Sequence, residues 1–252
     1  MSSGLLIALS VLLPVAGAFV VLALGKWPNA REAVTIITGG GTLWLVSGLL
    51  PYLREGARPR LDILEVVPGV QLAFEVEPLG LLFAFVASFL WIVTTIYAIG
   101  YMRGHEEENQ TRFYFFFAIA IAGAIGVAFS ANLFTLFAFY EVLTLCTFPL
   151  VTHHQTDEAR RAGRVYLGVL LTTSIAFQLL AIIWTWQLAG TVEFTQGGIL
   201  AGTASAGVLG AILVLFVFGV GKAAVMPFHR WLPAAMVAPT PVSALLHAVA
   251  IV

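Results

Sequence analysis

Two charged residues lie inside otherwise uncharged apolar segments, each long enough to cross a lipid bilayer. Lys222 lies within AGVLGAILVLFVFGVGKAAVMPF, and Glu141 lies within NLFTLFAFYEVLTLCTFPLV. An ionised side chain at the centre of a bilayer costs at least about 2.5–3.5 kcal/mol, so such residues persist where they pair, titrate or line a hydrated path. Two opposite charges in two different segments therefore predict a charge relay through a membrane protein.

The composition agrees with an integral membrane protein. The 252-residue chain is 60% hydrophobic and 10% charged, whereas an average soluble domain carries about 25% charged residues. Its net charge of −1 gives no indication of nucleic-acid binding. The single cysteine, Cys146, lies in an apolar segment and is interpreted as a small buried hydrophobe. The apolar N-terminus is interpreted as an uncleaved first span, because no basic residue precedes it and no cleavage-site pattern follows it.

The hydropathy pattern predicts an all-α bundle that forms one transmembrane domain over residues 1–252. Each crossing needs about 20 apolar residues, and seven such segments precede the start of an eighth helix near residue 241. The eighth segment ends at Val252 without a charge or an interfacial aromatic residue. We therefore expect further helices, on a longer chain or a second polypeptide, to complete it. The predicted spans are 5–24, 34–53, 79–101, 113–130, 131–152, 165–188 and 207–236.

Basic residues in the connections predict the orientation. Seven crossings place eight Lys and Arg residues on one side and three on the other. Because cytoplasmic loops carry the excess of Lys and Arg, the N-terminus and the loop 54–78 are predicted to lie outside. The eight are Lys26, Arg31, Arg103, Arg112, Arg160, Arg161, Arg164 and Arg230; the three are Arg54, Arg58 and Arg60.

The loops on the two sides differ in character. In the outer loop, the β-rich runs LDILEVV and VQLAFEVE flank Pro68-Gly69, which predicts a short external β-hairpin. The inner loops 102–112 and 153–164 are rich in charge and are interpreted as solvated faces. The adjacent His153 and His154 lack further ligands in the sequence pattern, so we interpret them as surface residues and predict no metal site.

The segment 207–236 is too long for one straight span. As a single helix it measures about 45 Å, whereas the hydrocarbon core is about 30 Å thick. Pro227 has no amide to donate to the carbonyl of Ala223, and its ring clashes there. We therefore predict a discontinuous helix whose first half ends at Lys222, with Pro227 as the helix break and gating residue. Free carbonyls at such an end favour a cation, and broken helices at mid-membrane mark transport sites in carriers.

The buried titratable groups Glu141, Lys222 and His247 are the predicted proton relay. Burial and mutual attraction act in opposite directions on the proton affinity of a charged pair, which allows a lysine to load and release a proton. His247 lies in an apolar segment that follows Pro239-Thr240-Pro241, and histidine suits proton transfer near neutral pH. The alternatives are a static ion pair between Glu141 and Lys222 and a hydrogen-bonded packing role for His247. No cofactor motif is present: GVGK at 219–222 lacks the spacing of a phosphate-binding loop.

Two motifs resemble a known family. Residues 221–248 read GKAAVMPFHRWLPAAMVAPTPVSALLHA, and FYEV surrounds Glu141. The chain resembles the antiporter-like membrane subunits of respiratory NADH:quinone oxidoreductase, including those similar to its chains L, M and N. It equally resembles the A and D subunits of multisubunit Na⁺/H⁺ (Mrp-type) antiporters and subunits of energy-converting hydrogenases. The resemblance covers essentially the whole chain and about the first half of a typical family member.

The resemblance implies roles for individual residues. Glu141 matches the glutamate of the fifth helix, which pairs with the lysine of the seventh helix, and Lys222 matches that lysine, the central proton carrier. His247 matches the position in the eighth helix that links one half-channel to the next. The resemblance also implies the broken seventh helix and the external hairpin. Two positions depart from the pattern: Tyr140 stands where the family often has Trp, and Ala234 stands where many members have an acidic residue.

These observations predict a proton-translocating subunit of a multisubunit complex in the inner membrane of a prokaryote. The first interpretation is a Mrp-type monovalent cation/proton antiporter. One alternative is the proton-pumping arm of an NADH:quinone oxidoreductase or a hydrogenase, a translocase whose redox sites lie on other subunits; another is a structural scaffold without transport. The expected partners are other membrane subunits, the lipid bilayer, H⁺ and, as a candidate counter-ion, Na⁺. Neither a cofactor nor nucleic acid is expected.

Overall fold

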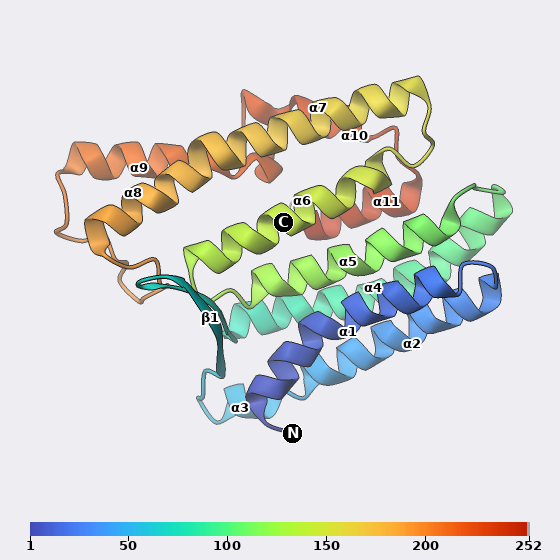
Figure 1. Ribbon diagram of the computed structural model, residues 1–252, viewed down its shortest axis with the longest axis horizontal. Helices are drawn as coiled ribbons and strands as arrows, with labels where there is room; N and C mark the ends of the chain where they lie inside the picture. The colour runs from blue at the N-terminus through green and yellow to red at the C-terminus, as the bar shows by residue number, and fades with distance from the viewer. Residues whose placement is uncertain (251–252) are drawn as a thin grey trace.

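The computed structural model describes residues 1–250 and forms a helical bundle with a two-stranded sheet near one end (Figure 1). In this part of the chain, six helical segments are long and apolar enough to cross a membrane. A seventh apolar helix is shorter, and the chain after it continues as short pieces, so the predicted discontinuous seventh helix is confirmed. The six segments are Ser3–Ala23, Pro28–Arg54, Pro78–Gly104, Gln110–Ala128, Leu133–Val151 and Asp157–Ala189.

The elements keep the labels of Figure 1. The first five spans comprise α1 (Ser3–Ala23), α2 (Pro28–Ser47) with α3 (Leu50–Arg54), α4 (Pro78–Gly104), α5 (Gln110–Ala128) and α6 (Leu133–Val151). The sixth comprises α7 (Asp157–Thr173), a π-helical turn (Ser174–Leu179) and α8 (Leu180–Ala189). The seventh begins as α9 (Ala206–Gly219), followed by 3-10 turns at Gly221–Ala223 and Phe228–Arg230 and by α10 (Trp231–Ala235). The eighth begins as α11 (Thr240–Leu245), followed by a π-helical turn (Leu246–Ala250).

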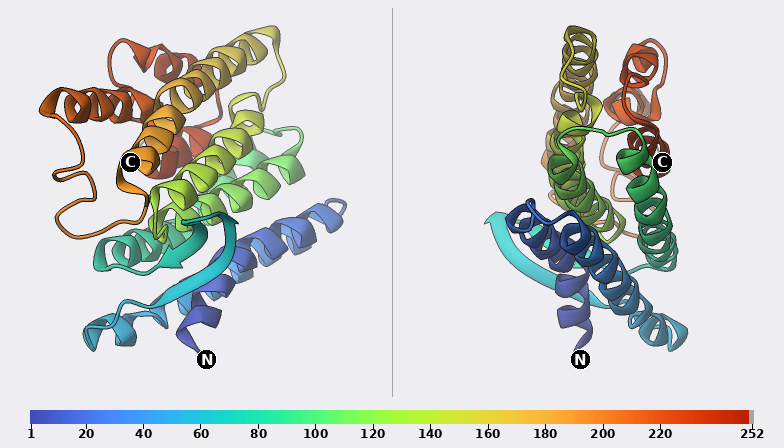
Figure 2. Two further views of the ribbon diagram at one scale, coloured as in Figure 1. Left: turned by 60° about the vertical axis from the view of Figure 1, so that its left-hand side comes forward. Right: turned by 90° about the vertical axis from the view of Figure 1, so that its right-hand side faces the viewer.

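The connections between spans alternate between the two ends of the bundle (Figure 1). One end carries the turns after α1, α4 and α6, and the other carries the N-terminus, the hairpin and the connection between α8 and α9. This is the alternation that the predicted succession of crossings implied. Figure 2 shows from two further directions that the helices run roughly along one common axis.

Helix α7 begins earlier than the apolar pattern suggests. Residues 153–164 were expected to form a loop, which is wrong from Asp157 onward, where the helix starts; the expected solvated face is present, because most of these residues are exposed. The side chain of Thr156 accepts a hydrogen bond from the amide of Ala159, and Asp157 and Glu158 occupy the first turn, where negative charge is favoured. The first turns are amphipathic: the small residues face the bundle and the arginines face outward, so polar residues extend the helix beyond the span itself. The buried residues are Ala159, Ala162 and Gly163; the exposed ones are Arg160, Arg161 and Arg164.

The predicted β-hairpin is present. Strands β1 (Arg60–Val67) and β2 (Val70–Glu75) pair antiparallel around the Pro68-Gly69 turn, where Gly69 adopts a φ of +79°. The amide of Ala73 donates a 3.0 Å hydrogen bond to the Thr135 hydroxyl. The side-chain amide of Asn132 donates to the carbonyl of Gln71 at 2.8 Å. The hairpin therefore fastens the start of α6, the helix that carries Glu141.

Candidate functional site at the break in the seventh helix

Lys222 lies in the interruption of the seventh span. Helix α9 ends at Gly219, and Lys222 follows in the 3-10 turn Gly221–Ala223, before Ala224 with a left-handed φ of +51°. The expectation that the helix ends at the lysine is therefore wrong by three residues. Pro227 lies beyond the break, after a cis peptide bond with Met226. The missing amide of Pro227 concerns the carbonyl of Ala223, which lies four residues beyond the end of α9. That Pro227 contributes to the break stays a prediction.

Close packing against the sixth span accompanies the break. A Cβ atom on Gly219 would lie 2.6 Å from the amide nitrogen of Gln178, and one on Gly221 would overlap the hydroxyl of Thr173. Thr173 directly precedes the π-helical turn Ser174–Leu179, and Gln178 lies within it. Two irregular backbones thus meet at this point, and π-turns within α-helices occur frequently at functional sites. The π-turn was not expected from the sequence; the glycines on either side of Val220 were the available signal.

Tyr140 contacts Lys222 in three ways. The lysine is only 3% exposed, and its Nζ donates a 2.7 Å hydrogen bond to the backbone carbonyl of Tyr140. The same Nζ lies 3.8 Å from the centre of the Tyr140 ring. The backbone amide of Lys222 donates a 3.1 Å hydrogen bond to the Tyr140 hydroxyl. The indole N–H of Trp231 donates to the carbonyl of Gly221 at 2.9 Å and fixes the turn from the other side.

Glu141 lies beside this arrangement without joining it. It follows Tyr140 on α6, and its Oε1 is buried without a hydrogen-bond partner. Among the ion pairs within 4.0 Å that the described residues form, none links Glu141 with Lys222. The structure thus brings the two predicted relay residues to one region, but the ammonium rests on the residue before the glutamate. The direct pair that the resemblance implied is not formed in this arrangement.

Buried hydroxyl groups continue from this site along α6. Thr144 donates a 2.9 Å hydrogen bond to the same Tyr140 carbonyl that receives the lysine. One turn further, the Thr147 hydroxyl lies 2.6 Å from the hydroxyl of Tyr166 on α7. All three hydroxyl-bearing side chains are completely buried. They were not identified from the sequence, although the two threonines follow Tyr140 at helical spacing on one face.

His247 lies apart from the other two relay candidates. It is exposed on the surface of this chain, in the π-helical turn after α11. Its Nδ1 lies 2.7 Å from the carbonyl of Ser243, within its own helix. No hydrogen bond or ion pair of the described residues connects it to Lys222 or Glu141. The three predicted residues therefore do not form one contiguous cluster.

His153 has an environment that the sequence did not predict. The interpretation as a surface residue is wrong, because His153 is only 2% exposed. Its Nε2 lies 3.7 Å from Oε2 of Glu107, and neither ring nitrogen has a hydrogen-bond partner. Burial lowers the pKa of the His153 imidazole to about 4, and the positive charge of Arg112 acts in the same direction. No three His, Cys, Asp or Glu residues in the described part of the chain are placed to hold a metal ion.

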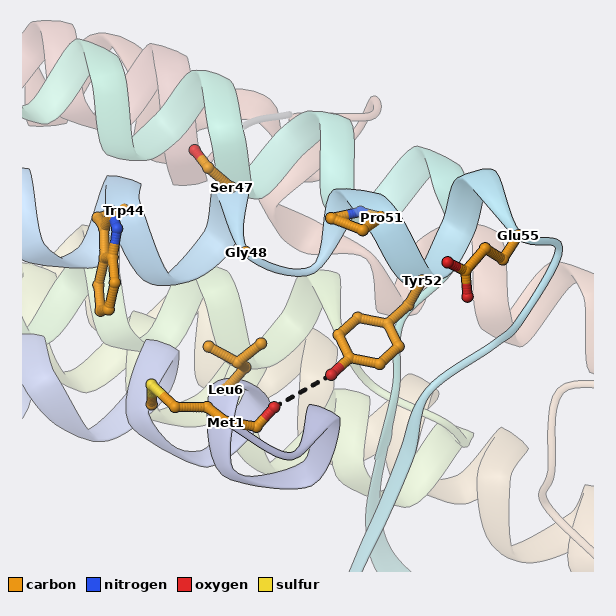
Figure 3. Close-up of a pocket in the computed structure, with 8 residues that line it drawn as sticks. All are labelled: Met1, Leu6, Trp44, Ser47, Gly48, Pro51, Tyr52 and Glu55. Atoms are coloured by element: carbon orange, nitrogen blue, oxygen red, sulfur yellow. Dashed lines mark hydrogen bonds between the residues drawn. The ribbon is translucent and has the colours of Figure 1, made fainter.

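The largest hollow described lies elsewhere, beside the N-terminus (Figure 3). It measures about 760 Å³ and is lined by residues of α1, α2 and α3, among them Leu6 and Trp44. The hydroxyl of Tyr52 donates a 3.1 Å hydrogen bond to the carbonyl of Met1 across it. Glu55, its charged side chain, is exposed. The hollow thus lacks the buried charge that distinguishes the surroundings of Lys222.

Two sequence-family models match the chain. The model described as "NADH:quinone oxidoreductase/Mrp antiporter, TM" matches residues 130–252, which include both Glu141 and Lys222. The model described as "NADH-Ubiquinone oxidoreductase (complex I), chain 5 N-terminus" matches residues 68–114. The hairpin turn, α4 and the start of α5 lie in the second match.

Individual relatives divide between two kinds of complex. A probable K⁺/H⁺ antiporter A/B subunit of Rhizobium meliloti (strain 1021) is 29% identical over 98% of this chain and 25% of its own length. The NADH-quinone oxidoreductase subunit L of Escherichia coli (strain K12) is 28% identical over 98% of this chain and 42% of its own length. The chain thus spans less than half the length of these two relatives.

A solved structure has the same fold. A chain of the membrane-bound sulfane sulfur reductase, an archaeal respiratory membrane complex, superimposes with a TM-score of 0.85. The match covers 99% of this chain and 51% of the other, at 21% sequence identity. At this identity the likeness concerns the fold alone.

Proposed function

This chain belongs to the family of antiporter-like membrane subunits found in Mrp-type antiporters and NADH:quinone oxidoreductases, and on that premise we propose that it translocates protons within a multisubunit membrane complex. Lys222 is the proton carrier in this proposal, Glu141 is its charged partner, and His247 passes the proton on to a neighbouring part of the complex. The chain is a multi-pass membrane protein. We further propose that it lies in the inner membrane of a prokaryote with its N-terminus outside.

The observation that carries the proposal is the burial of Lys222 at the interruption of the seventh span. A 3% exposed lysine in a broken helix has no packing function that an apolar residue would not fulfil better. Glu141 offers it a carboxylate on the facing helix, with one buried oxygen that no donor occupies. A lysine between two acceptors is able to alternate between them as its charge changes.

Transport against a membrane potential needs an external source of energy. Moving one charge through 100 mV takes about 2.3 kcal/mol, and the described residues hold no group that would supply it. In the favoured form of the proposal, the source is the gradient of a monovalent cation, as in a Mrp-type antiporter. The similarity to the antiporter protein of Rhizobium meliloti supports this form. The similarity to subunit L of the Escherichia coli oxidoreductase supports the second candidate, a pump driven by redox subunits.

Proton flux in proteoliposomes that contain the complete complex tests the proposal. Lys222→Ala is expected to abolish flux and Glu141→Gln to reduce it strongly, while co-purification of the other subunits stays normal. Lys26→Ala, which removes an exposed lysine, is the matched control and is expected to leave flux unchanged. Wild-type flux in an assembled Lys222→Ala complex would refute the relay. Loss of assembly in both relay variants would instead support the structural scaffold.

The same preparation separates the two candidates. Proton flux that depends on added K⁺ or Na⁺ without an electron donor would support the antiporter. Flux that requires an electron donor and co-purifying iron–sulfur or flavin subunits would support the redox-driven pump.

A further inference from the structure

We propose that Tyr140 provides Lys222 with a resting position away from Glu141, so that the lysine alternates between two neighbouring residues of α6. The inference deepens the proposed function and rests on Lys222 being the proton carrier. Tyr140 is a positioning residue in this scheme. It exchanges no proton itself.

The ammonium group meets two features of Tyr140. Its hydrogen bond to the backbone carbonyl is short, at 2.7 Å, and its 3.8 Å distance to the ring centre places the charge over an aromatic face. An aromatic face attracts a cation more strongly where both are removed from water, and Tyr140 is only 6% exposed. The carbonyl and the ring therefore replace part of the solvation that Lys222 loses in the interior.

The hydroxyl of Tyr140 holds the backbone of the same lysine. The amide of Lys222 lies in the turn after α9, where it donates to this hydroxyl at 3.1 Å. An unpaired buried amide would be costly, so this bond stabilises the break at the position from which the side chain reaches α6. One residue thus fixes both the backbone and the ammonium of Lys222.

Glu141 supplies the second position. Its buried Oε1 has no donor in this arrangement, and a buried acceptor without a partner is costly. Glu141 directly follows Tyr140 on α6, and in this scheme rotations of the Lys222 side chain carry its ammonium from one residue to the other. The structure corresponds to the state in which the ammonium rests on Tyr140 and the carboxylate is available.

The hydroxyl contact depends on tyrosine at this position. Tryptophan, which often stands before the glutamate in the family that the sequence resembles, offers an aromatic face, but its indole N–H is a donor only. It has no acceptor for the amide of Lys222. Tyr140 therefore combines two functions, of which tryptophan retains one.

Three substitutions in the complete complex test the inference, with proton flux measured across a range of pH. Tyr140→Leu removes the ring and the hydroxyl, and is expected to lower flux about tenfold and to move the pH profile of flux toward acidic pH by about one unit. Tyr140→Phe keeps the ring and is expected to lower flux about fivefold with an unchanged pH profile. Tyr140→Trp is expected to recover the wild-type profile and to match the flux of the phenylalanine variant.

The outcomes separate this inference from the proposed function. Wild-type flux and a wild-type pH profile in an assembled Tyr140→Leu complex would overturn the inference. It would also be overturned if Tyr140→Phe and Tyr140→Trp had flux as low as Tyr140→Leu and the same shifted pH profile. If the leucine variant fails to assemble, wild-type flux in Tyr140→Phe would overturn the role of the hydroxyl, and the fivefold loss would support it. Lys222→Ala is the reference. If the Lys222→Ala complex still transports protons, the proposed function fails. If it transports none while the Tyr140→Leu complex is fully active, only the role of Tyr140 is refuted.

Discussion

Arg103 at the end of α4 binds the buried carboxylate of Glu32 in the first turns of α2 through two hydrogen bonds. Glu32 also pairs with Arg31, at 3.2 Å, and both of these residues are only 4% exposed. Arg31 continues the network to Gln110 and Thr111 at the start of α5. Hydrogen bonds from the two arginines thus join three spans at one end of the bundle. From the sequence, both arginines were expected only to determine orientation.

We expect Glu32→Ala to destabilise the protein by about 3 kcal/mol, because it leaves the buried Arg31 without a counter-charge. Thermal unfolding in detergent measures the effect. Glu55→Ala is the control, since Glu55 is exposed and forms no ion pair in the described part of the chain; a change within about 0.5 kcal/mol is expected. Equal melting temperatures for the two variants would show that the network contributes nothing.

Gly221→Ala is expected to displace the turn that carries Lys222. The new methyl group would overlap the hydroxyl of Thr173, which is itself held by the carbonyls of Val169 and Leu170. Both flux and melting temperature should fall, and Thr173→Ala in the same chain should restore part of each. Gly210→Ala is the control, because the position that its new Cβ would take in α9 has no contact within 4 Å. If Gly221→Ala behaves like Gly210→Ala, the close packing is not required.

Pro227→Ala is expected to leave the melting temperature no higher than that of the wild type. Replacing a proline that interrupts a continuous helix would stabilise the helix by about 3 kcal/mol. Here α9 already ends at Gly219. Thermal unfolding and proton flux are measured on the same preparation. A clear rise in melting temperature would contradict this expectation. The predicted gating role of Pro227 requires a separate result, namely reduced proton flux with normal assembly.

The buried imidazole of His153 predicts a loss of stability in acid. Its pKa of about 4 lies below the ordinary value of 6.5, so the unfolded chain binds a proton that the folded chain does not, and stability decreases as the pH falls from about 6.5 to about 4. His153→Leu should remove this part of the pH dependence and be no less stable at neutral pH, because neither ring nitrogen has a hydrogen-bond partner. His229→Leu removes an exposed histidine and should keep the wild-type pH dependence. Parallel pH dependences for all three proteins would contradict the assignment.

Single cysteines test the orientation. A membrane-impermeant thiol reagent applied to whole cells should label Ala57→Cys, before the hairpin, and should label Gly104→Cys, at the end of α4, only after the membrane is opened. Both positions are exposed, and the native Cys146 is buried, which keeps the background low. Labelling of both cysteines from outside would refute the alternation of the loops across the membrane.

The local sequence of each segment determined most of the secondary structure of this protein. Apolar length determined the spans, the Pro68-Gly69 turn between β-rich runs determined the hairpin, and a segment too long for one crossing determined that the seventh helix is discontinuous. These features depend on residues close together in the chain. The polar first turns of α7 were missed because a hydropathy pattern measures insertion into lipid, whereas capping and helix propensity extend the helix beyond it.

The tertiary structure alone decided what Lys222 contacts. The sequence determined that Glu141 and Lys222 are costly to bury, but only the fold brings the end of α9 at Gly219 into close packing against the π-turn of another span. The contact between Lys222 and Tyr140 joins residues that are 82 positions apart. Such contacts follow from how two irregular backbones fit together, and no local pattern of hydrophobicity or spacing encodes that fit.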